Sequence, residues 1–310
     1  MPSLTVVGSL NMDFVVRVDK LPASGETVTG SRFQTIPGGK GANQANAAAR
    51  LARPPLTVRM AGCVGQDANG DLLRASLAAS GADIGGIRTA KAEPTGIAMI
   101  WVDREGRNSI VVAPGANHAL TPVHVGPMRP AFSDSRYVLF QLETPLDTVA
   151  KAMRLAAECG AQCILDPAPA VPLSQDILQA AAILTPNETE AAALLGARTG
   201  PSSPDDARDM AAALIAMGPR AVILKLGEAG CYYYDGIEAI HSPGFAVGAV
   251  DTTAAGDTFN GALAVALSEG APMAHALRFA NAAAAVSVTR AGAQSSAPSR
   301  HEADAMAAEL

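Results

Sequence analysis

The segment from Asp251 to Leu263, DTTAAGDTFNGAL, joins small residues to a carboxylate at the start of an expected helix. The small residues Ala254, Ala255 and Gly256 let the backbone approach a ligand closely, and the first helical turn presents free N–H groups. Together these features predict an anion site. Asp257 either complements the helix dipole there, which the spacing alone slightly favours, or acts as a general base that deprotonates an alcohol attacking a bound phosphoryl group.

A second candidate is Pro37–Ala45, PGGKGANQA, in which three glycines precede an Ala-rich helical pattern. Asn43 falls in the first turn of that helix and could bond hydroxyl groups. The segment is not a Walker A loop, because Gln34 stands where its first glycine would be and Gly41 follows Lys40. The alternative is a tight loop whose glycines serve only turn geometry.

Polar residues also follow two other expected strands. Asn11 and Asp13 come just after the first strand, and they share one side of an extended segment. Both could bond sugar hydroxyls, although an Asx turn would use the same residues. Glu143 has a comparable position after the strand expected at 137–141. Its negative charge could equally stabilise the N-terminal end of the helix expected at 145–159.

Two further turns follow strands and suit a nucleotide. Glu188 and Glu190 open a helix, so they either complement its positive end or organise Mg²⁺ through water. The glycine-bounded turn Lys225–Gly230, KLGEAG, could pass along a nucleotide or merely connect two strands.

Composition limits the class of protein. The 310 residues are 49% apolar with a net charge of −6, which excludes dominant disorder and bulk-charge binding of nucleic acid. No apolar run reaches the length of a membrane span, and the N-terminus does not resemble a signal peptide. Four scattered cysteines are expected to be reduced core residues. We therefore expect a cytoplasmic protein with no nucleic-acid or membrane partner.

The elements that must position these residues alternate between short apolar strands and Ala-rich helices. This alternation predicts an α/β fold with a mainly parallel central sheet, flanked by helices on both faces, that binds ligands at the carboxyl ends of its strands. The expected strands are 4–8, 57–62, 137–141, 162–166, 182–185 and 221–226. The expected helices are 42–52, 71–80, 145–159, 188–195, 204–217, 255–267, 272–289 and 299–310.

Two regions break the alternation, Phe14–Phe33 and Thr95–Gly115, and the second reads as a β-hairpin turning at Gly106. Together they predict a small antiparallel sheet with an apolar face that needs a partner. It could be a lid, a dimer contact or both, or only an edge extension. We expect one domain over 1–310, with a lid subdomain from about 14–35 and 95–115.

In chain order, GSLNMD, GETVTG, GGKGANQA, QLETP, DPAPA, TPNETEA, DTTAAGDTFNGAL and TRAGAQSSAP resemble motifs of the ribokinase-like family of sugar and nucleoside kinases. The resemblance covers nearly the whole chain, and the pair GGKGAN and DTTAAGD is its most specific part. It implies phosphorylation of D-ribose at O5 by ATP, with Mg²⁺, a K⁺ activator and a homodimer formed through the lid.

The resemblance also implies roles for individual residues. Asp257 would be the base, with the backbone of Ala254, Ala255 and Gly256 as the anion hole. The sugar would contact Asn11, Asp13, Gly39, Lys40, Gly41, Asn43, Glu143 and Asp257. ATP would contact Asn187, Lys225, Leu226, Gly227, Glu228, Ala229, Gly230, Gly256 and Asn281. Glu190 would support Mg²⁺ through water. The monovalent cation would take oxygens from Asp251, Thr253, Ser287, Arg290, Gly292 and Ser296.

Other functions remain open from the sequence. A kinase of the same family could act on deoxyribose, fructose or a nucleoside. A sugar-binding regulator without catalysis would share the scaffold, although it would not need a base beside an anion hole. A dinucleotide oxidoreductase is disfavoured, because no G-x-G-x-x-G follows the first strand.

Overall fold

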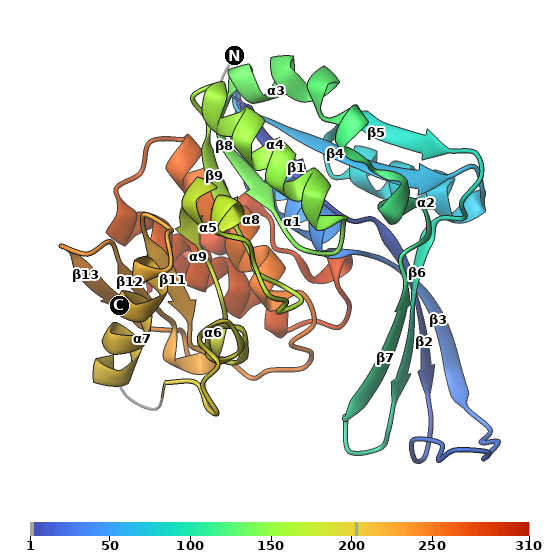
Figure 1. Cartoon of the computed structure of the whole chain (residues 1–310). Helices are drawn as coiled ribbons and strands as arrows, with labels where there is room; N and C mark the ends of the chain where they lie inside the picture. Colours follow the sequence, from blue (N-terminus) through green and yellow to red (C-terminus); the bar gives the residue numbers. More distant parts are fainter. Residues whose placement is uncertain (1–2, 202–203, 310) are drawn as a thin grey trace.

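The main sheet is the element on which the site is built (Figure 1). The computed structural model describes residues 3–201 and 204–309, so Leu310 at the end of the last expected helix lies outside the described residues. Within them, nine strands form one sheet in the order β13-β12-β11-β10-β9-β8-β1-β4-β5. The strands are β1 (Ser3–Val7), β4 (Thr57–Gly65), β5 (Asp83–Ala90), β8 (Ser135–Phe140), β9 (Gln162–Leu165), β10 (Ala181–Leu184), β11 (Val222–Lys225), β12 (Cys231–Tyr234) and β13 (Ala239–Ser242).

The sheet is mainly parallel, as expected. Only the pairs β11–β12 and β12–β13 are antiparallel. From β1 the chain adds β4 and β5 on one side, and it then crosses to β8 and continues through β9 to β11 on the other. The order therefore reverses between β1 and β8, and ligands of such sheets bind at this reversal, beyond the carboxyl ends of the strands.

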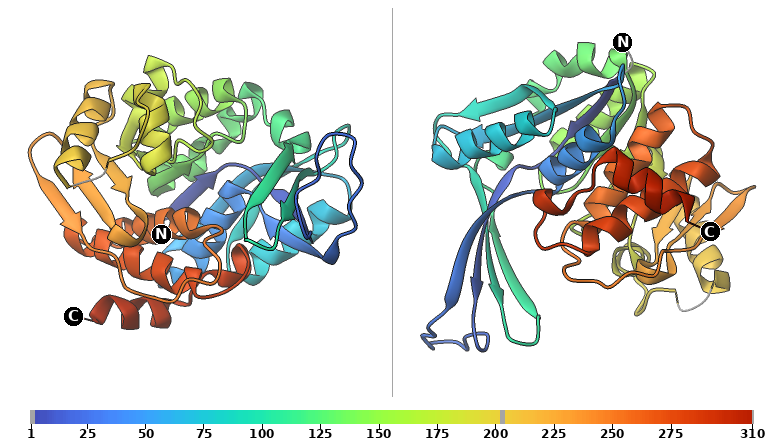
Figure 2. Two further views of the ribbon diagram at one scale, coloured as in Figure 1. Left: turned by 90° about the horizontal axis from the view of Figure 1, so that it is seen from below. Right: turned by 180° about the vertical axis from the view of Figure 1, so that it is seen from behind.

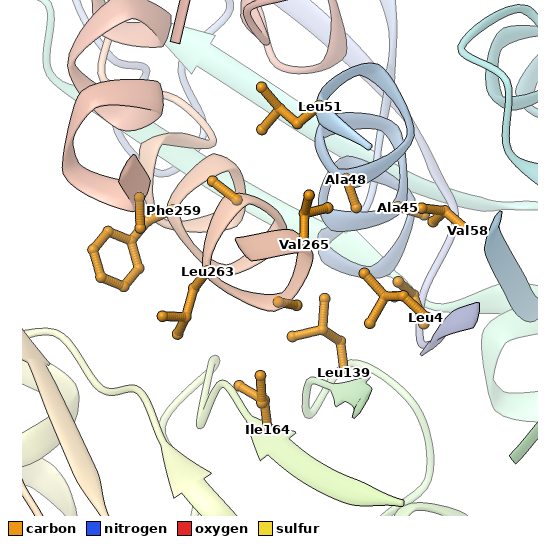
Figure 3. Packing of buried hydrophobic residues seen from close by; sticks show 14 of the residues in the cluster. Leu4, Ala45, Ala48, Leu51, Val58, Leu139, Ile164, Phe259, Leu263 and Val265 are labelled. Carbon is orange, nitrogen blue, oxygen red and sulfur yellow. The ribbon is translucent and has the colours of Figure 1, made fainter. Parts of the chain in front are cut away.

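Helices cover both faces of the sheet, so all five residues of β1 are buried. Alternate strand residues feed two apolar clusters, one on each face. Figure 3 shows the first cluster, where Ala45 and Ala48 of α1 and Leu263 and Val265 of α8 lie near Leu4 and Leu139 of the sheet. This face carries α1 (Lys40–Leu51), α2 (Ala68–Ala79), α8 (Ala255–Ser268), α9 (Met273–Val288) and α10 (Arg300–Ala308). The other carries α3 (Arg129–Asp134), α4 (Leu146–Glu158), α5 (Gln175–Ala180), α6 (Glu188–Leu195) and α7 (Pro204–Ala216).

A second, four-stranded sheet projects from the main body (Figures 1 and 2). Its order is β3-β2-β6-β7. The outer pairs are antiparallel, and the central pair β2–β6 is parallel. Several large apolar side chains on it are exposed, among them Phe33 (64%) and Val111 (57%). Its strands are β2 (Asn11–Arg17), β3 (Ser31–Gly38), β6 (Gly96–Val102) and β7 (Asn108–Ala113).

The predicted α/β architecture is confirmed, and the differences are local. The expected strands do not include β5 or the hairpin β12–β13. The strand β5 forms by pairing with β4 and has no apolar run, whereas β12 is a buried run of one Cys and three Tyr, which favours a strand. The helix expected at 71–80 begins at Ala68, since Asp67 caps it by accepting from the Gly70 N–H. Among the described residues, no helix has the length and apolar character required to cross a membrane.

Candidate active site

The floor of the site lies where β1 and β8 end. Ser9, just past β1, donates a hydrogen bond from Oγ to Glu143 Oε2, just past β8. The same carboxylate oxygen accepts from the Lys40 N–H at the start of α1 (3.2 Å). Gly41 lets α1 approach this closely, because a Cβ there would lie 2.6 Å from the Gly8 carbonyl carbon. The expected sugar residues Lys40, Gly41 and Glu143 are thus brought together.

Asp257 lies in the first turn of α8, buried among polar side chains. Its Oδ2 accepts from Asn43 Nδ2 (3.0 Å) and its Oδ1 from Gln44 Nε2 (3.1 Å). Burial raises the pKa of Asp257 to about 6, with Lys40 opposing the rise and Asp166 adding to it. The carboxylate is therefore ionised at neutral pH and yet more basic than an exposed one, which suits a general base.

An unpartnered polar atom lies on a side chain that contacts this carboxylate. Asn43 Oδ1 is buried and has no hydrogen-bond partner among the described residues. Burial raises the pKa of Asp13 to about 7, and Glu143 and Asp257 add to the rise. Asn11 Oδ1 accepts from Asn117 Nδ2 (2.8 Å), a residue that the sequence did not single out. Unpartnered buried acceptors beside carboxylates suit a ligand rich in hydroxyl groups.

Lys40 contributes a cation that interacts electrostatically with Asp257 and Glu143. Burial acts to lower its pKa, but Asp257, Asp166 and Glu143 outweigh burial and raise that pKa above its ordinary value. Its ammonium is therefore charged and has no hydrogen-bond partner among the described residues.

The anion site begins at Ala254, which caps α8 in the left-handed conformation (φ 59°). A non-glycine residue there costs about 1–2 kcal/mol. The Ala255 N–H already donates to the Thr252 carbonyl (3.3 Å). Among the described residues, the N–H groups of Ala254, Gly256 and Asp257 have no acceptor, so they are free donors at the start of this helix. Of the three residues expected to form the anion hole, Ala254 and Gly256 thus have free N–H groups, and Asp257 adds another.

A buried polar chain connects the base to a lysine. Gln44 Nε2 also donates to Asp166 Oδ2 (2.9 Å), whose other oxygen accepts from Lys225 Nζ (2.9 Å). Gln141 Nε2 in turn donates to Gln44 Oε1 (2.6 Å). Gln44, Gln141 and Asp166 are not among the residues expected at the site. They do lie in the motifs GGKGANQA, QLETP and DPAPA, which could have indicated them.

A pocket of about 710 Å³ adjoins the anion site. Of the residues expected to face ATP, it is lined by Lys225, Gly227, Glu228, Gly230, Gly256 and Asn281. Leu226, Ala229 and Asn187 are not among its lining residues. The pocket is also lined by residues that were not expected from the sequence. They lie in the segment after β13 and on the adjoining face of α9, and they are Gly244, Phe245, Ala246, Val247, Ala249, Ala284, Ala285 and Val288. Asn281 holds that segment by donating to the Ser242 and Pro243 carbonyls.

Asn187 and Glu190 form a capping box at the start of α6. Asn187 Oδ1 accepts from the Glu190 N–H, and Glu190 Oε2 accepts from the Asn187 N–H (2.8 Å each). Burial raises the pKa of Glu190, against the opposing effect of Lys225. Among the described residues, no group of three His, Cys, Asp or Glu side chains could hold a metal directly.

The residues expected to bind a monovalent cation come from two segments that lie side by side. Asp251 Oδ1 accepts from the Thr253 N–H, and Oδ2 from the Gly292 N–H (2.9 Å each). The Ser287 and Ser296 hydroxyls donate to nearby carbonyls, which leaves their lone pairs free. The Arg290 guanidinium pairs with Glu302, so only its carbonyl could serve.

Comparison with known proteins agrees with this geometry. A family model described as pfkB family carbohydrate kinase matches residues 1–300. Ribokinase of Schizosaccharomyces pombe is 41% identical, over 98% of this chain and 97% of the relative. Ribokinase of Bacillus subtilis is 43% identical, over 97% of this chain and 98% of the relative. The structure of Arabidopsis thaliana ribokinase complexed with ribose and ATP has a TM-score of 0.92 and 34% identity, and it covers 100% and 99% of the two chains.

The resemblance to ribokinase-like proteins is confirmed, and the chain belongs to the pfkB family of carbohydrate kinases.

Proposed function

We propose that this chain transfers the terminal phosphoryl group of ATP to O5 of D-ribose, giving ribose 5-phosphate and ADP. The observation that carries the proposal is the first turn of α8, where the buried Asp257 carboxylate stands beside the free N–H groups of Gly256 and Asp257. A base next to an anion hole is the arrangement that phosphoryl transfer to an alcohol requires. The similarity to ribokinases supports the choice of sugar.

The sugar is held by Asn11, Asp13, Asn43 and Glu143, with the Gly39–Gly41 backbone and Lys40 beneath it. Asp257 takes the proton of the 5-hydroxyl as the bond from O5 to phosphorus forms. The bond between that phosphorus and the bridging oxygen breaks, and ADP leaves with the electron pair. The two free N–H groups stabilise the charge on the phosphoryl oxygens during the transfer.

ATP lies in the pocket between the Lys225–Gly230 turn and α9, with its phosphates directed at the start of α8. Glu190 fits a role at Mg²⁺ through water, because Asn187 occupies one of its oxygens and leaves the other free. Bound Mg²⁺ neutralises charge on the phosphates. Asp251, Thr253, Ser287, Arg290, Gly292 and Ser296 supply oxygens for K⁺, and this cation would join the two segments that flank the start of α8.

The small sheet serves as a lid and as the contact of a homodimer. Asn11 and Asp13 lie on β2, so movement of this sheet would carry two sugar contacts with it. The exposed apolar residues Phe33, Met99 and Val111 need a partner in water, and a second copy of the same sheet provides one. We place the enzyme in the cytoplasm, where ATP is available and the four unpaired cysteines stay reduced.

The test is ADP release from MgATP in K⁺ buffer, without sugar and with D-ribose, 2-deoxyribose, fructose or adenosine. Strong stimulation by ribose alone is the expected result. Stimulation by another acceptor would retain the chemistry and overturn the assignment of the sugar contacts. If ribose binds but no acceptor stimulates ADP release from ATP, the chain would be a sugar-binding regulator without catalysis.

The K⁺ assignment has its own test, which compares the same rates in Na⁺-only and K⁺ buffers. A higher rate in K⁺ is expected, and equal rates would contradict the assignment.

A further inference from the structure

Lys225 stands where the nucleotide pocket meets the anion hole. Its side chain is 12% exposed, and its ammonium donates to Asp166 Oδ1 at 2.9 Å. A Cβ built on Gly256 would lie 3.4 Å from Lys225 Nζ. The ammonium therefore lies close to Gly256, whose N–H is free, and Lys225 lines the pocket assigned to ATP.

The contacts of Asp166 leave this ammonium with donors to spare. The Asp166 carboxylate is buried, and Gln44 donates to its second oxygen. An ammonium has three N–H donors, and the bond to Asp166 uses one. Among the described residues Lys225 Nζ has no other hydrogen-bond partner. Two of its donors thus remain for a ligand in the pocket.

We propose that Lys225 is a catalytic residue of the phosphoryl transfer, whose ammonium binds an oxygen of the terminal phosphate beside the N–H groups of Gly256 and Asp257. Asp166 is then a positioning residue, which holds the ammonium in place, and Gln44 joins it to the base. The inference rests on the proposed function and adds a side-chain cation to an anion hole otherwise made of backbone.

The simpler alternative is that Lys225 only neutralises the buried Asp166. The two roles differ in what happens when both charges are removed together. A counter-ion is no longer needed once Asp166 is neutral, whereas a phosphate ligand is still missing.

The experiment compares Lys225→Met, Asp166→Asn and the double variant with wild type, using the ribose-dependent release of ADP. Lys225→Met is expected to lower kcat by about 10²–10³-fold, in the range seen when one oxyanion donor is removed. Its KM for ribose should stay within about twofold. By calorimetry, it should bind a non-hydrolysable ATP analogue more weakly while its affinity for ADP is unchanged. Lys151→Met, at an exposed lysine of α4, is the matched control and should leave all values unchanged.

Asp166→Asn is expected to lower kcat with an unchanged KM for ribose, because the freed ammonium is no longer held at the phosphate. Lys225→Met is expected to lower the melting temperature, because it leaves Asp166 without a counter-ion. The double variant should recover the wild-type melting temperature but not the wild-type kcat.

Recovery of the rate in the double variant would assign Lys225 as a counter-ion and overturn the proposal. A kcat for Lys225→Met within about threefold of wild type would also overturn it. If wild type itself released no ADP with any sugar, the proposed function would fail instead.

Discussion

A side chain that takes a proton from an alcohol must be ionised at the working pH and still basic. Asp257 meets both requirements, since burial raises its pKa and the amides of Asn43 and Gln44 stabilise its charge. We expect Asp257→Asn to lower kcat by about 10³-fold or more while ribose still binds. ADP release and calorimetry measure the two effects. Asp147→Asn, also an acidic residue in the first turn of a helix, is the control. An active Asp257→Asn enzyme would show that another group is the base.

The same carboxylate sets a pH dependence. Asp257 accepts a proton only when ionised, and its pKa is raised to about 6. The rate kcat/KM for ribose should therefore fall tenfold per pH unit below about 6 and level off above it. A pH–rate profile between 4.5 and 8.5 checks this. If kcat/KM fell only below about pH 4, near the ordinary pKa of an exposed aspartate, the pKa of Asp257 would not be raised by burial.

Asp13 lowers stability at the pH where the enzyme would work. Its pKa is raised from 3.8 to about 7, so the folded chain binds a proton that the unfolded chain releases, and ionisation at higher pH opposes folding. Asp13→Asn should raise the free energy of unfolding at pH 8 by about 2–4 kcal/mol, and the gain should vanish below about pH 4.

Urea unfolding at several pH values measures the effect of Asp13→Asn, with Asp147→Asn as the control. Ribose affinity should fall in the same variant, because Asp13 is proposed to hold the sugar. A variant that is less stable than wild type at pH 8 would refute the account.

The residues of the site were predictable as a group, but their partners were not. Asn43 and Asp257 stand in two recognisable motifs, and the structure brings them within 3.0 Å. Gln44 is next to Asn43 in the chain, yet its hydrogen bond to Asp166 depends on where the start of α1 lies relative to the residue that follows β9. Such a contact joins residues 122 positions apart, and local patterns do not encode the direction of a side chain across that separation.

The contact between α1 and β1 decides the shape of the site. The Gly41 Cα lies against Gly8 and Ser9, where a Cβ would meet backbone atoms at 2.6–2.7 Å. Gly41→Ala should therefore push the helix outward, lower the free energy of unfolding by about 1–3 kcal/mol and weaken ribose binding. Gly126→Ala is the matched control, because a Cβ there meets nothing within 4 Å. Urea unfolding and calorimetry check both variants, and equal stabilities would rule out the close contact.

Elements marked by a capping motif or a buried apolar run were predictable almost to the residue. The helix expected at 188–195 is α6, and the strand expected at 162–166 is β9. The strand β5, Asp83–Ala90, contains two glycines and two charged residues, so nothing local marks it as a strand. Its form comes from parallel pairing with β4 at the edge of the sheet, which is a property of the folded chain.

On the scale of the whole molecule, the small sheet exposes several large apolar side chains, among them Phe33, Ile110 and Val111, and we propose that a second copy covers them. We expect light scattering at micromolar concentration to give twice the mass of the 31.4 kDa chain. Ile110→Asp, on the edge strand β7, should shift the protein to the monomer. Ile237→Asp is the control, since Ile237 is 96% exposed on the turn between β12 and β13. A monomeric wild type, or a dimeric Ile110→Asp, would refute the lid contact.

The packing of α8, from the last fifth of the chain, against α1 near its start has a consequence for the chain during its synthesis. The sugar contacts emerge from the ribosome early, on residues 11–43 and 143, whereas the base and the anion hole follow only at 256 and 257. If Asp257 is the base, as proposed, a chain that ends before α8 has the residues proposed to hold the sugar but no base. We therefore expect nascent or truncated chains of this kind not to consume ATP.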